Sequence, residues 1–369
     1  MSKWDMVRLG DVCEIVSGST PRTNNPELWN GGIKWVTPAE LSDDSYFVHD
    51  TERYISEEAG LKPMPAGTVL LSSRAPIGKV AIAAVPMCCN QGFKNLICSE
   101  GIHNRYLYRW LKSQTAYLNS LGRGATFKEV SRQIVADVEI PLPPLDVQKR
   151  IADILDQVAA IIEKRKAQIV KLDLLVKAKF VDMFGDPVLN PMGWEVEIFS
   201  EICENLNSRR IPITASDRKD GQYPYYGASG IIDYVDGYIF DEDLLLISED
   251  GANLLARVTP IAFSVYGKIW VNNHAHVLRF AENATRLYVE NRINLIDISD
   301  SVTGSAQPKL NQANLNAMLI PMPPIELQHQ FADFVRQVEK SKAQMQQGLG
   351  KLELLYKSLM QKCFAGEMF

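Results

Sequence analysis

Several features that would assign this 369-residue sequence to a particular class of protein are absent. Its six cysteines form no Cys-x-x-Cys pair, and adjacent Cys88 and Cys89 are a poor chelating pair, so buried thiols in a reducing compartment are favoured over a metal site. The N-terminus has no apolar signal core, and the longest apolar run, from Val80 to Cys89, is half a membrane span and contains Pro86. We therefore expect a soluble, cytoplasmic protein with no membrane contact.

An excess of positive charge is also absent. The formal net charge is −5 and the pI is about 5.7, which gives no global support for binding to nucleic acid. A DNA-binding protein with this balance must gather its basic residues on one face. The composition is otherwise ordinary, with 46% hydrophobic and 22% charged residues, so the chain can bury sizeable cores. Its length predicts two or more domains.

Signatures of catalysis are missing as well. Gly78-Lys79 and Gly267-Lys268 resemble the end of a phosphate-binding loop, but the required upstream glycine and the following Ser or Thr are absent. No Gly-rich loop follows a strand, no Asn-Pro-Pro-aromatic or Asp-Pro-Pro-aromatic motif occurs, and no nucleophile signature is present. His274 and His276 alternate along an expected strand and could share a face, but two further metal ligands are lacking nearby. We expect a protein that is not an enzyme, with no catalytic residue and no metal site.

What the sequence does contain is an internal repeat. IPLPPLDVQKRIADILDQV, starting at Ile140, returns as IPMPPIELQHQFADFVRQV, starting at Ile320, with nine of 19 positions identical at an offset of 180. KLDLLVK at Lys171 matches KLELLYK at Lys351 with the same offset, and the segments that begin at Trp4 and Trp194 echo each other at an offset of 190. A solenoid would repeat every few tens of residues, so the repeat indicates two duplicated modules.

The repeated stretch predicts a long helix in each copy. Prolines mark the entry, an acidic residue follows at the positive end of the helix dipole, and apolar residues recur at alternating steps of four and three. The first helix would have nearly forty residues and end at Gly185; the second contains Gly348 and Gly350, each of which weakens a helix by about 1 kcal/mol and could mark a kink. Because a narrow apolar stripe needs a partner helix, we expect the two copies to pair as a coiled coil. The alternative is that each helix packs only on its own domain.

The remaining segments predict two α+β modules. GTVLLSS, VAIAAV, DLLLISED and AHVLRF have the pattern of strands bounded by turns, and a short helix is expected at 105–120. We therefore divide the chain into a first α+β domain (1–139), a first long helix (140–186), a second α+β domain (187–319) and a second long helix (320–369). Long loops rich in Arg, Lys, Asn, Gln and aromatic residues interrupt the strands and suit contacts with phosphates and base edges, although such loops are more often simply solvated.

With these features the chain resembles the specificity subunit (S, HsdS) of type I restriction-modification systems. The resemblance covers the whole chain. The matching motifs of the first half are GSTPRTNNPELWNGGIKWVTPAEL (from Gly18), PAGTVLLSSRAPIGKVAIA (from Pro65), NQGFKNL (from Asn90), GATFKEVS (from Gly124) and IPLPPLDVQKRIADIL (from Ile140). Those of the second half are YPYYGASGIIDY (from Tyr223), LLLISEDG (from Leu244) and IPMPPIELQ (from Ile320).

The resemblance implies two target-recognition domains on a pseudo-twofold frame, joined by two long antiparallel helices. It further implies a non-catalytic subunit that reads a bipartite sequence in double-stranded DNA, one half per domain, while the helices set the spacer and dock two methyltransferase (M) subunits. Restriction (R) subunits would join the complex. No cofactor is expected on this chain; S-adenosylmethionine, ATP and Mg are expected on the partner subunits. The alternatives are a scaffold that assembles a protein complex without DNA, which the acidic net charge favours slightly, and a recognition subunit of a related defence system.

Two sets of site residues follow as hypotheses. Arginine can pair with guanine through two hydrogen bonds, and lysine suits phosphate, although a basic residue is more often a solvated or ion-paired surface group. The predicted DNA-contacting residues are Arg74, Lys79, Gln91, Lys94, Arg123, Lys128, Arg132, Arg209, Arg210, Tyr226, Lys268, Asn272, His274 and Lys309. On the helices, Ile151, Ile154, Val158 and Leu172 are expected to meet Phe331, Phe334, Val338 and Leu352, or the methyltransferase, through apolar burial.

Overall fold

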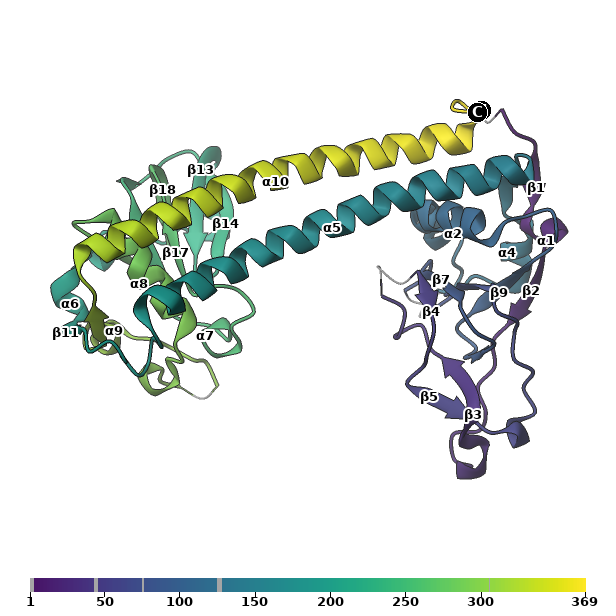
Figure 1. Ribbon diagram of the computed structural model, residues 1–369, viewed down its shortest axis with the longest axis horizontal. Coiled ribbons are helices and arrows are strands. Elements are labelled where there is room, and N and C mark those ends of the chain that lie inside the picture. The colour runs from purple at the N-terminus through teal and green to yellow at the C-terminus, as the bar shows by residue number, and fades with distance from the viewer. Residues whose placement is uncertain (1–2, 43–45, 75, 125–127, 305) are drawn as a thin grey trace. The chain divides into compact units, whose positions relative to one another are not determined.

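The computed structural model describes residues 3–42, 46–74, 76–124, 128–304 and 306–369. The chain forms two compact units, one of residues 1–165 with 348–369 and the other of residues 166–347. The unit boundaries fall inside the two longest helices, α5 (Leu145–Phe184) and α10 (Ile325–Ala365), so both helices contribute to both units (Figure 1). Both units mix helices and strands, as expected for the α+β class. The four-part division at residues 139, 186 and 319 stays a prediction.

The first unit contains two main sheets. The larger has the order β2-β9-β6-β7-β4, and its strands are Cys13–Ser17, Lys94–Cys98, Val69–Leu71, Val80–Ala83 and Phe47–Val48. The smaller has the order β5-β3-β8, with strands Arg53–Ile55, Trp29–Val36 and Cys88–Cys89. A separate pair joins β1 (Met6–Arg8) to β10 (Glu139–Pro141). The helices besides α5 and α10 are α1 (Leu9–Val12), α2 (Asn104–Ser113), α3 (Thr115–Ser120) and α4 (Arg132–Asp137).

The second unit repeats this plan. One sheet has the order β12-β19-β16-β17, with strands Glu204–Asn205, Ala275–Arg279, Leu244–Ser248 and Ala262–Val265. The other has the order β14-β13-β18-β15, with strands Gly230–Val235, Asp220–Gly227, Lys268–Val271 and Phe240–Asp241. A two-stranded pair joins β11 (Glu195–Ile198) to β20 (Leu319–Met322). Its remaining helices are α6 (Phe199–Ile202), α7 (Asn253–Ala256), α8 (Asn283–Leu295) and α9 (Gln312–Asn316).

The four strands predicted from alternating or buried apolar runs correspond to β6, β7, β16 and β19. The single helix expected at 105–120 is divided into α2 and α3 at Gln114. Side-chain hydroxyls explain the break, because Ser113 donates to the carbonyl of Trp110 and Thr115 to that of Lys112, in competition with the helical ladder.

The repeated proline-rich stretch anchors each long helix to its own unit. In the first unit the buried Gln148 amide donates to the carbonyl of Pro143 at 2.9 Å, and the Tyr106 hydroxyl donates to that of Pro141 at 2.6 Å. In the second unit Gln328 donates to Pro323 at 2.7 Å, and Tyr288 donates to Pro321 at 2.6 Å. In both copies a Gln amide and a Tyr hydroxyl therefore satisfy the corresponding proline carbonyls at the helix entry.

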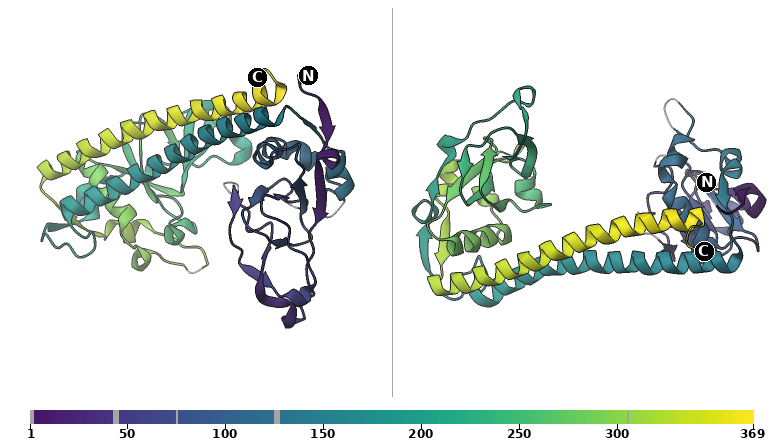
Figure 2. Two further views of the ribbon diagram at one scale, coloured as in Figure 1. Left: turned by 45° about the vertical axis from the view of Figure 1, so that its right-hand side comes forward. Right: turned by 90° about the horizontal axis from the view of Figure 1, so that it is seen from above.

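Within each unit α5 and α10 lie side by side (Figure 2). In the second unit Phe331 packs edge-on against Phe180 and Phe184, with ring centroids 5.5 and 5.4 Å apart. In the first unit the start of α5 shares a core with the end of α10, which includes Cys363 and Phe364. Helix α10 continues through Gly348 and Gly350, and a Cβ added at either position would meet no atom within 4 Å.

The predicted interface residues are divided between two cores. Leu172 lies in one core with Phe331, Phe334 and Val338, whereas Ile151 lies in the other, beside Tyr356 and Leu359 of α10. The remaining three, Ile154, Val158 and Leu352, are half-buried. The beginning of α5 packs beside the end of α10, so Ile151 and Phe331 lie in the cores of different units.

All six cysteines are free thiols, and each is buried or half-buried, as predicted. Among the described residues, no helix is both long and apolar enough to cross a bilayer.

Candidate nucleic-acid interface

One loop in each unit docks on the end of a central strand through the same backbone hydrogen bonds. In the first unit Val130 N donates to Ser73 O at 2.9 Å, and Arg123 and Glu129 exchange two bonds of 3.0 and 2.9 Å. In the second unit Leu310 N donates to Glu249 O at 2.8 Å, and Thr303 and Lys309 exchange two bonds of 2.8 Å. Residues 125–127 and 305 lie outside the described residues.

A third segment completes the arrangement. Ser73 N donates to Gly92 O at 2.7 Å in the first unit, and Glu249 N donates to His274 O at 2.9 Å in the second. We call the first set of residues, Ser73, Arg74, Lys94, Arg123 and Glu129, the first junction. The residues of the second unit that take the same places in this hydrogen-bond pattern form the second junction. They are Glu249, Asp250, His276, Thr303 and Lys309.

The first junction is a group of cations around one carboxylate. Glu129 accepts from Arg74 Nε at 3.0 Å and from Lys94 Nζ at 3.1 Å, and the Lys94 side chain is 8% exposed. Burial acts to raise the pKa of Glu129, but the hydrogen bonds from Lys94 and Arg74 outweigh it, so that pKa lies below its ordinary value. The carboxylate therefore stays ionised and neutralises the buried ammonium.

Beside this group lies a surface hollow of about 340 Å³, lined by Thr37, Pro38, Ala39, Arg74, Pro76, Lys79, Asn90, Gln91 and Gly92. Two of its lining residues, Arg74 and Gln91, are exposed to solvent. Thr20 donates to the side-chain oxygen of Gln91, which leaves the amide nitrogen as the group that can donate outward.

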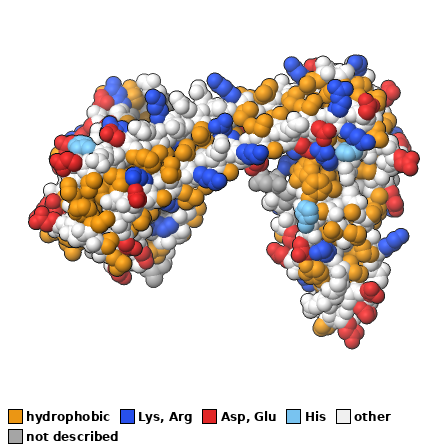
Figure 3. All heavy atoms as spheres, in the orientation of Figure 1, with side chains coloured by type: hydrophobic (Ala, Val, Ile, Leu, Met, Phe, Trp, Pro, Cys, Tyr) orange, Lys and Arg blue, Asp and Glu red, His pale blue; other side chains and the backbone are white. Residues whose placement is uncertain are grey.

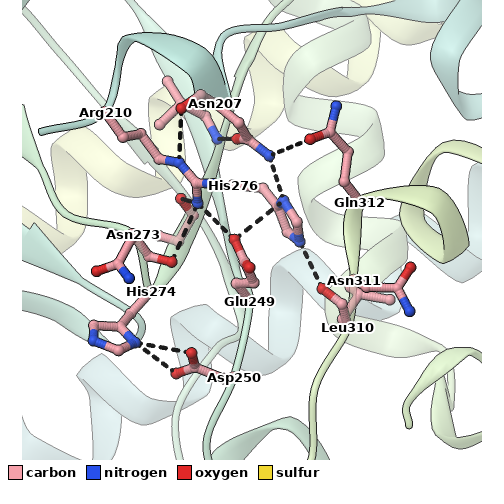
Figure 4. Close-up of polar contacts among 12 residues, drawn as sticks. Asn207, Arg210, Glu249, Asp250, Asn273, His274, His276, Leu310, Asn311 and Gln312 are labelled. Carbon is pink, nitrogen blue, oxygen red and sulfur yellow. Dashed lines mark hydrogen bonds and ion pairs between the residues drawn. The ribbon is translucent and has the colours of Figure 1, made fainter.

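In the second junction the carboxylate follows the central strand and the cation lies on the docked loop, which reverses the arrangement of the first junction. Here the carboxylate is that of Glu249, and it accepts from Arg210 Nη1 at 2.6 Å (Figure 4). It also accepts from Lys309 Nζ at 3.1 Å. Burial would raise the pKa of Glu249, but the Arg210 hydrogen bond and the neighbouring positive charges hold it below its ordinary value. The position of Glu129 is taken by Lys309, and the position of Arg74 is taken by Asp250.

His276 ties the docked loop of the second unit to strand β19. The ring is fully buried, its Nε2 donates to Leu310 O at 2.7 Å, and its Nδ1 accepts from the Asn207 amide at 2.8 Å (Figure 4). These partners require a neutral imidazole with its proton on Nε2. Burial accordingly lowers the pKa of His276.

This arrangement predicts acid sensitivity in the second unit. Since the pKa of His276 is lower in the folded than in the unfolded chain, its stabilising contribution is complete above about pH 6.5 and declines as the pH falls toward the folded value. We expect the free energy of unfolding to fall by up to about 1.4 kcal/mol per pH unit in that range. His276→Asn should be less stable at pH 8 but should lose this slope, as measured by denaturant unfolding from pH 8 to 5.

His329→Gln provides the matched control, because His329 is exposed on α10 and lies outside the junction. It should keep the slope of the original protein. An unchanged slope in His276→Asn would show that another group causes the acid sensitivity.

The other residues predicted from the sequence fall into two groups. The exposed ones are Arg74, Gln91, Arg123, Lys128, Arg132, Arg209, Lys268, His274 and Lys309. The buried or half-buried ones are Lys79, Lys94, Arg210, Tyr226 and Asn272.

The less exposed residues have internal partners. Lys79 Nζ donates to the carbonyl oxygens of Pro38 and Leu41, and the Asn272 side chain accepts from His274 N at 2.8 Å. Arg210 donates to the carboxylate of Glu249 and to the carbonyl oxygen of Ala275. Tyr226 stacks on Phe263 with ring centroids 6.1 Å apart. Their contact with DNA, like that of the exposed residues, stays a prediction.

The sequence left open whether His274 and His276 share a face; in the structure His274 is exposed and His276 is buried. Strand β19 begins at Ala275, so alternation does not extend to His274, which is exposed and pairs with Asp250. Sequence reasoning also missed the carboxylates Glu129, Glu249 and Asp250, because it searched the loops for cations. In the sequence these acidic residues stand within polar loops, Glu129 in residues 122–132 and Glu249 and Asp250 in residues 248–253.

Comparison with known proteins gives a consistent result. The family model described as the type I restriction modification DNA specificity domain matches residues 1–172 and 191–354. The MjaIX specificity subunit of a type I restriction enzyme from Methanocaldococcus jannaschii is 29% identical, over 99% of this chain and 93% of its own length. The EcoprrI specificity subunit from Escherichia coli is 25% identical over 87% of this chain and 84% of its own.

The fold also matches solved structures. The type I restriction-modification S subunit from M. genitalium superimposes with a TM-score of 0.60 at 16% identity, covering 98% of this chain and 96% of that one. A chain from a study of complex assembly and conformational transition of a type I R-M system gives a TM-score of 0.62 at 18% identity, covering 99% and 98%.

Proposed function

Because the chain belongs to the type I restriction modification DNA specificity family, we propose that it is the sequence-recognition subunit of a type I restriction-modification complex. Each unit reads one half of a bipartite sequence in double-stranded DNA. The observation that carries this proposal is the pair of junctions, in which one backbone scaffold presents two different sets of charged side chains. A duplicated scaffold with unequal surfaces suits two different half-sites on a duplex, whose backbone has twofold symmetry.

The two long helices complete the proposed arrangement. We infer that they pair as an antiparallel coiled coil about a pseudo-twofold axis, that they set the spacer between the half-sites, and that they dock two methyltransferase subunits. Exposed apolar side chains on the helices support docking of a protein, including Val170, Leu174, Leu354 and Leu355, which are 56–71% exposed. Hydrophobic atoms reach the surface along the helices in Figure 3.

Catalysis belongs to the partners in this proposal. The chain itself carries no catalytic role and binds no cofactor, while methyltransferase subunits use S-adenosylmethionine and restriction subunits use ATP and Mg. The complex acts in the cytoplasm, where its DNA lies. Both signs of charge mix on the face seen in Figure 3, so binding to DNA depends on local groups such as the junctions rather than on net charge.

The deciding experiment is modified-base sequencing of a plasmid from cells that express this chain with its neighbouring methyltransferase gene. We expect N6-methyladenine in a gapped two-part motif that disappears when this chain is omitted. A complex that assembles but leaves the plasmid unmethylated would favour the second candidate, a protein scaffold that does not bind DNA, or a related defence system. The exposed apolar helix residues are compatible with that scaffold. Salt-sensitive binding to duplex DNA would argue against it, because phosphate contacts release counterions.

The exposed Arg74 provides a local test. Arg74→Ala should relax or abolish modification at the first half-site, because the guanidinium can form two hydrogen bonds with a guanine edge. Folding should be unaffected, since the Arg74 side chain is 47% exposed and its ion pair contributes little. The motif is measured by modified-base sequencing and folding by thermal unfolding. Lys62→Ala, which removes another exposed cation of the same unit, should leave the motif intact. An unchanged motif in Arg74→Ala would remove Arg74 from the interface.

A further inference from the structure

The two junctions differ in the hydrogen-bonding groups that they turn toward solvent. In the first, Glu129 holds Arg74 through Nε at 3.0 Å. Among the described residues, neither Nη1 nor Nη2 of Arg74 has a hydrogen-bond partner. A guanidinium has only donors, so the Nη1 and Nη2 groups of Arg74 can bind only groups that accept hydrogen bonds.

At the corresponding place in the second unit, an acidic residue replaces the arginine. Asp250 accepts from His274 Nδ1 at 3.0 Å through Oδ1 and at 2.8 Å through Oδ2. An ionised carboxylate can only accept, so the histidine proton must lie on Nδ1 and a neutral ring then has its lone pair on Nε2. Asp250 therefore fixes His274 in the tautomer that can accept a hydrogen bond at Nε2.

The geometry turns that atom outward. The His274 side chain is 48% exposed, whereas the Asp250 side chain is 17% exposed and lies beside the ring, at its Nδ1 edge (Figure 4). Within the part of the chain that the structure describes, no hydrogen bond involves His274 Nε2. Asp250 is thus a support for the ring, and the ring is the group available to a ligand.

The backbone around the pair is held in place before any ligand binds. His274 N donates to the buried Asn272 side chain at 2.8 Å, and His274 O accepts from Glu249 N at 2.9 Å. Gly251 N donates to Pro308 O at 3.0 Å, which fixes the residue after Asp250 to the docked loop. A side chain held this way loses little conformational freedom on binding.

We propose that His274, oriented by Asp250, reads an exocyclic amino group of one base in the second half-site, whereas the first junction reads an acceptor edge through Arg74. This inference rests on the proposed function. In the major groove the amino groups are N6 of adenine and N4 of cytosine, and the edge with two acceptors belongs to guanine. Asp250 is a positioning residue, and His274 is the residue that touches the base.

The test uses the full chain, co-expressed with its methyltransferase, and modified-base sequencing of the plasmid. His274→Ala and Asp250→Ala should both lose discrimination at the same single base pair of the second half-site, by roughly 5- to 150-fold. The first half-site and the spacer should be unchanged. In the original protein, that base pair should present adenine or cytosine to the recognition subunit.

Two variants separate positioning from simple structural damage. Asp250→Asn retains an oxygen that can accept from Nδ1, so it should restore part of the discrimination lost in Asp250→Ala. Asp243→Asn is the matched control, because Asp243 is exposed and flanks the opposite end of the same strand, β16. It should give the original motif at the original level.

Each outcome is decisive. If the original protein gives no gapped motif, the proposed function fails. If it gives the motif and both alanine variants give the same motif, even at reduced yield, the function stands and the proposed reading by His274 is overturned. Loss of discrimination at two different base pairs, or at a pair that presents no amino group, would overturn it as well. Should Asp250→Ala fail to fold, His274→Ala and Asp250→Asn still test the same base pair.

Discussion

A four-residue insertion after Ala160 is expected to lengthen the spacer between the two half-sites and leave both half-site sequences unchanged. Ala160 is exposed on α5, which contributes residues to both units, so a longer α5 changes the length of helix between them. Four residues add about 6 Å of helix, and base pairs are stacked at about 3.4 Å, so an increase of one or two base pairs is expected. Modified-base sequencing measures the spacer directly.

Two control variants sharpen this test. Ala160→Gln changes the exposed residue without changing length, and it should keep the original spacer. A second variant adds four residues after Gly350 of α10 as well, so that both helices grow equally and their packing is less disturbed. If both insertion variants modify the original motif with an unaltered spacer, helix length does not set the spacing.

Asp156→Ala is expected to cause the largest loss of stability, about 3 kcal/mol in the first unit. Asp156 lies on α5 and accepts from Arg105 Nε at 2.8 Å, from Arg109 Nε at 2.6 Å and from the Tyr46 hydroxyl at 2.8 Å. The Arg109 side chain is only 8% exposed, so removal of the carboxylate leaves a buried charge without its counterion. The estimate lies at the low end for a buried pair because Arg105 is partly solvated.

The expected result is a fall of about 6–12 °C in the melting temperature of the first unit. Calorimetry gives the temperature, and hydrogen exchange in α2 identifies the unit that is affected, since two units need not unfold together. Asp153→Ala is the matched control: Asp153 lies on the same helix and pairs with Arg105 at 2.9 Å, but its side chain is 54% exposed. It should cost less than about 1 kcal/mol. Equal melting of the two variants would contradict the role given to Asp156.

Local and periodic features were predictable. The proline entry at Pro143 and the apolar steps of four and three predicted α5, which the structure places at Leu145–Phe184. A second copy at a constant offset predicted α10 in the same way. These predictions succeeded because helix formation depends on neighbours within a few residues, which the sequence shows directly.

Only the tertiary structure decided which loop side chains are available and what they can bind. Arg74 and Glu129 are 55 residues apart, and His274 and Asp250 are 24 apart, yet each pair is in hydrogen-bond contact because the strand order brings their loops together. The same order buries Lys94, which the sequence alone presented as one more loop cation. Sequence determined the duplicated frame because helices and strands arise from local patterns. The chemical character of each junction depends on contacts between distant segments, and those exist only in the folded chain.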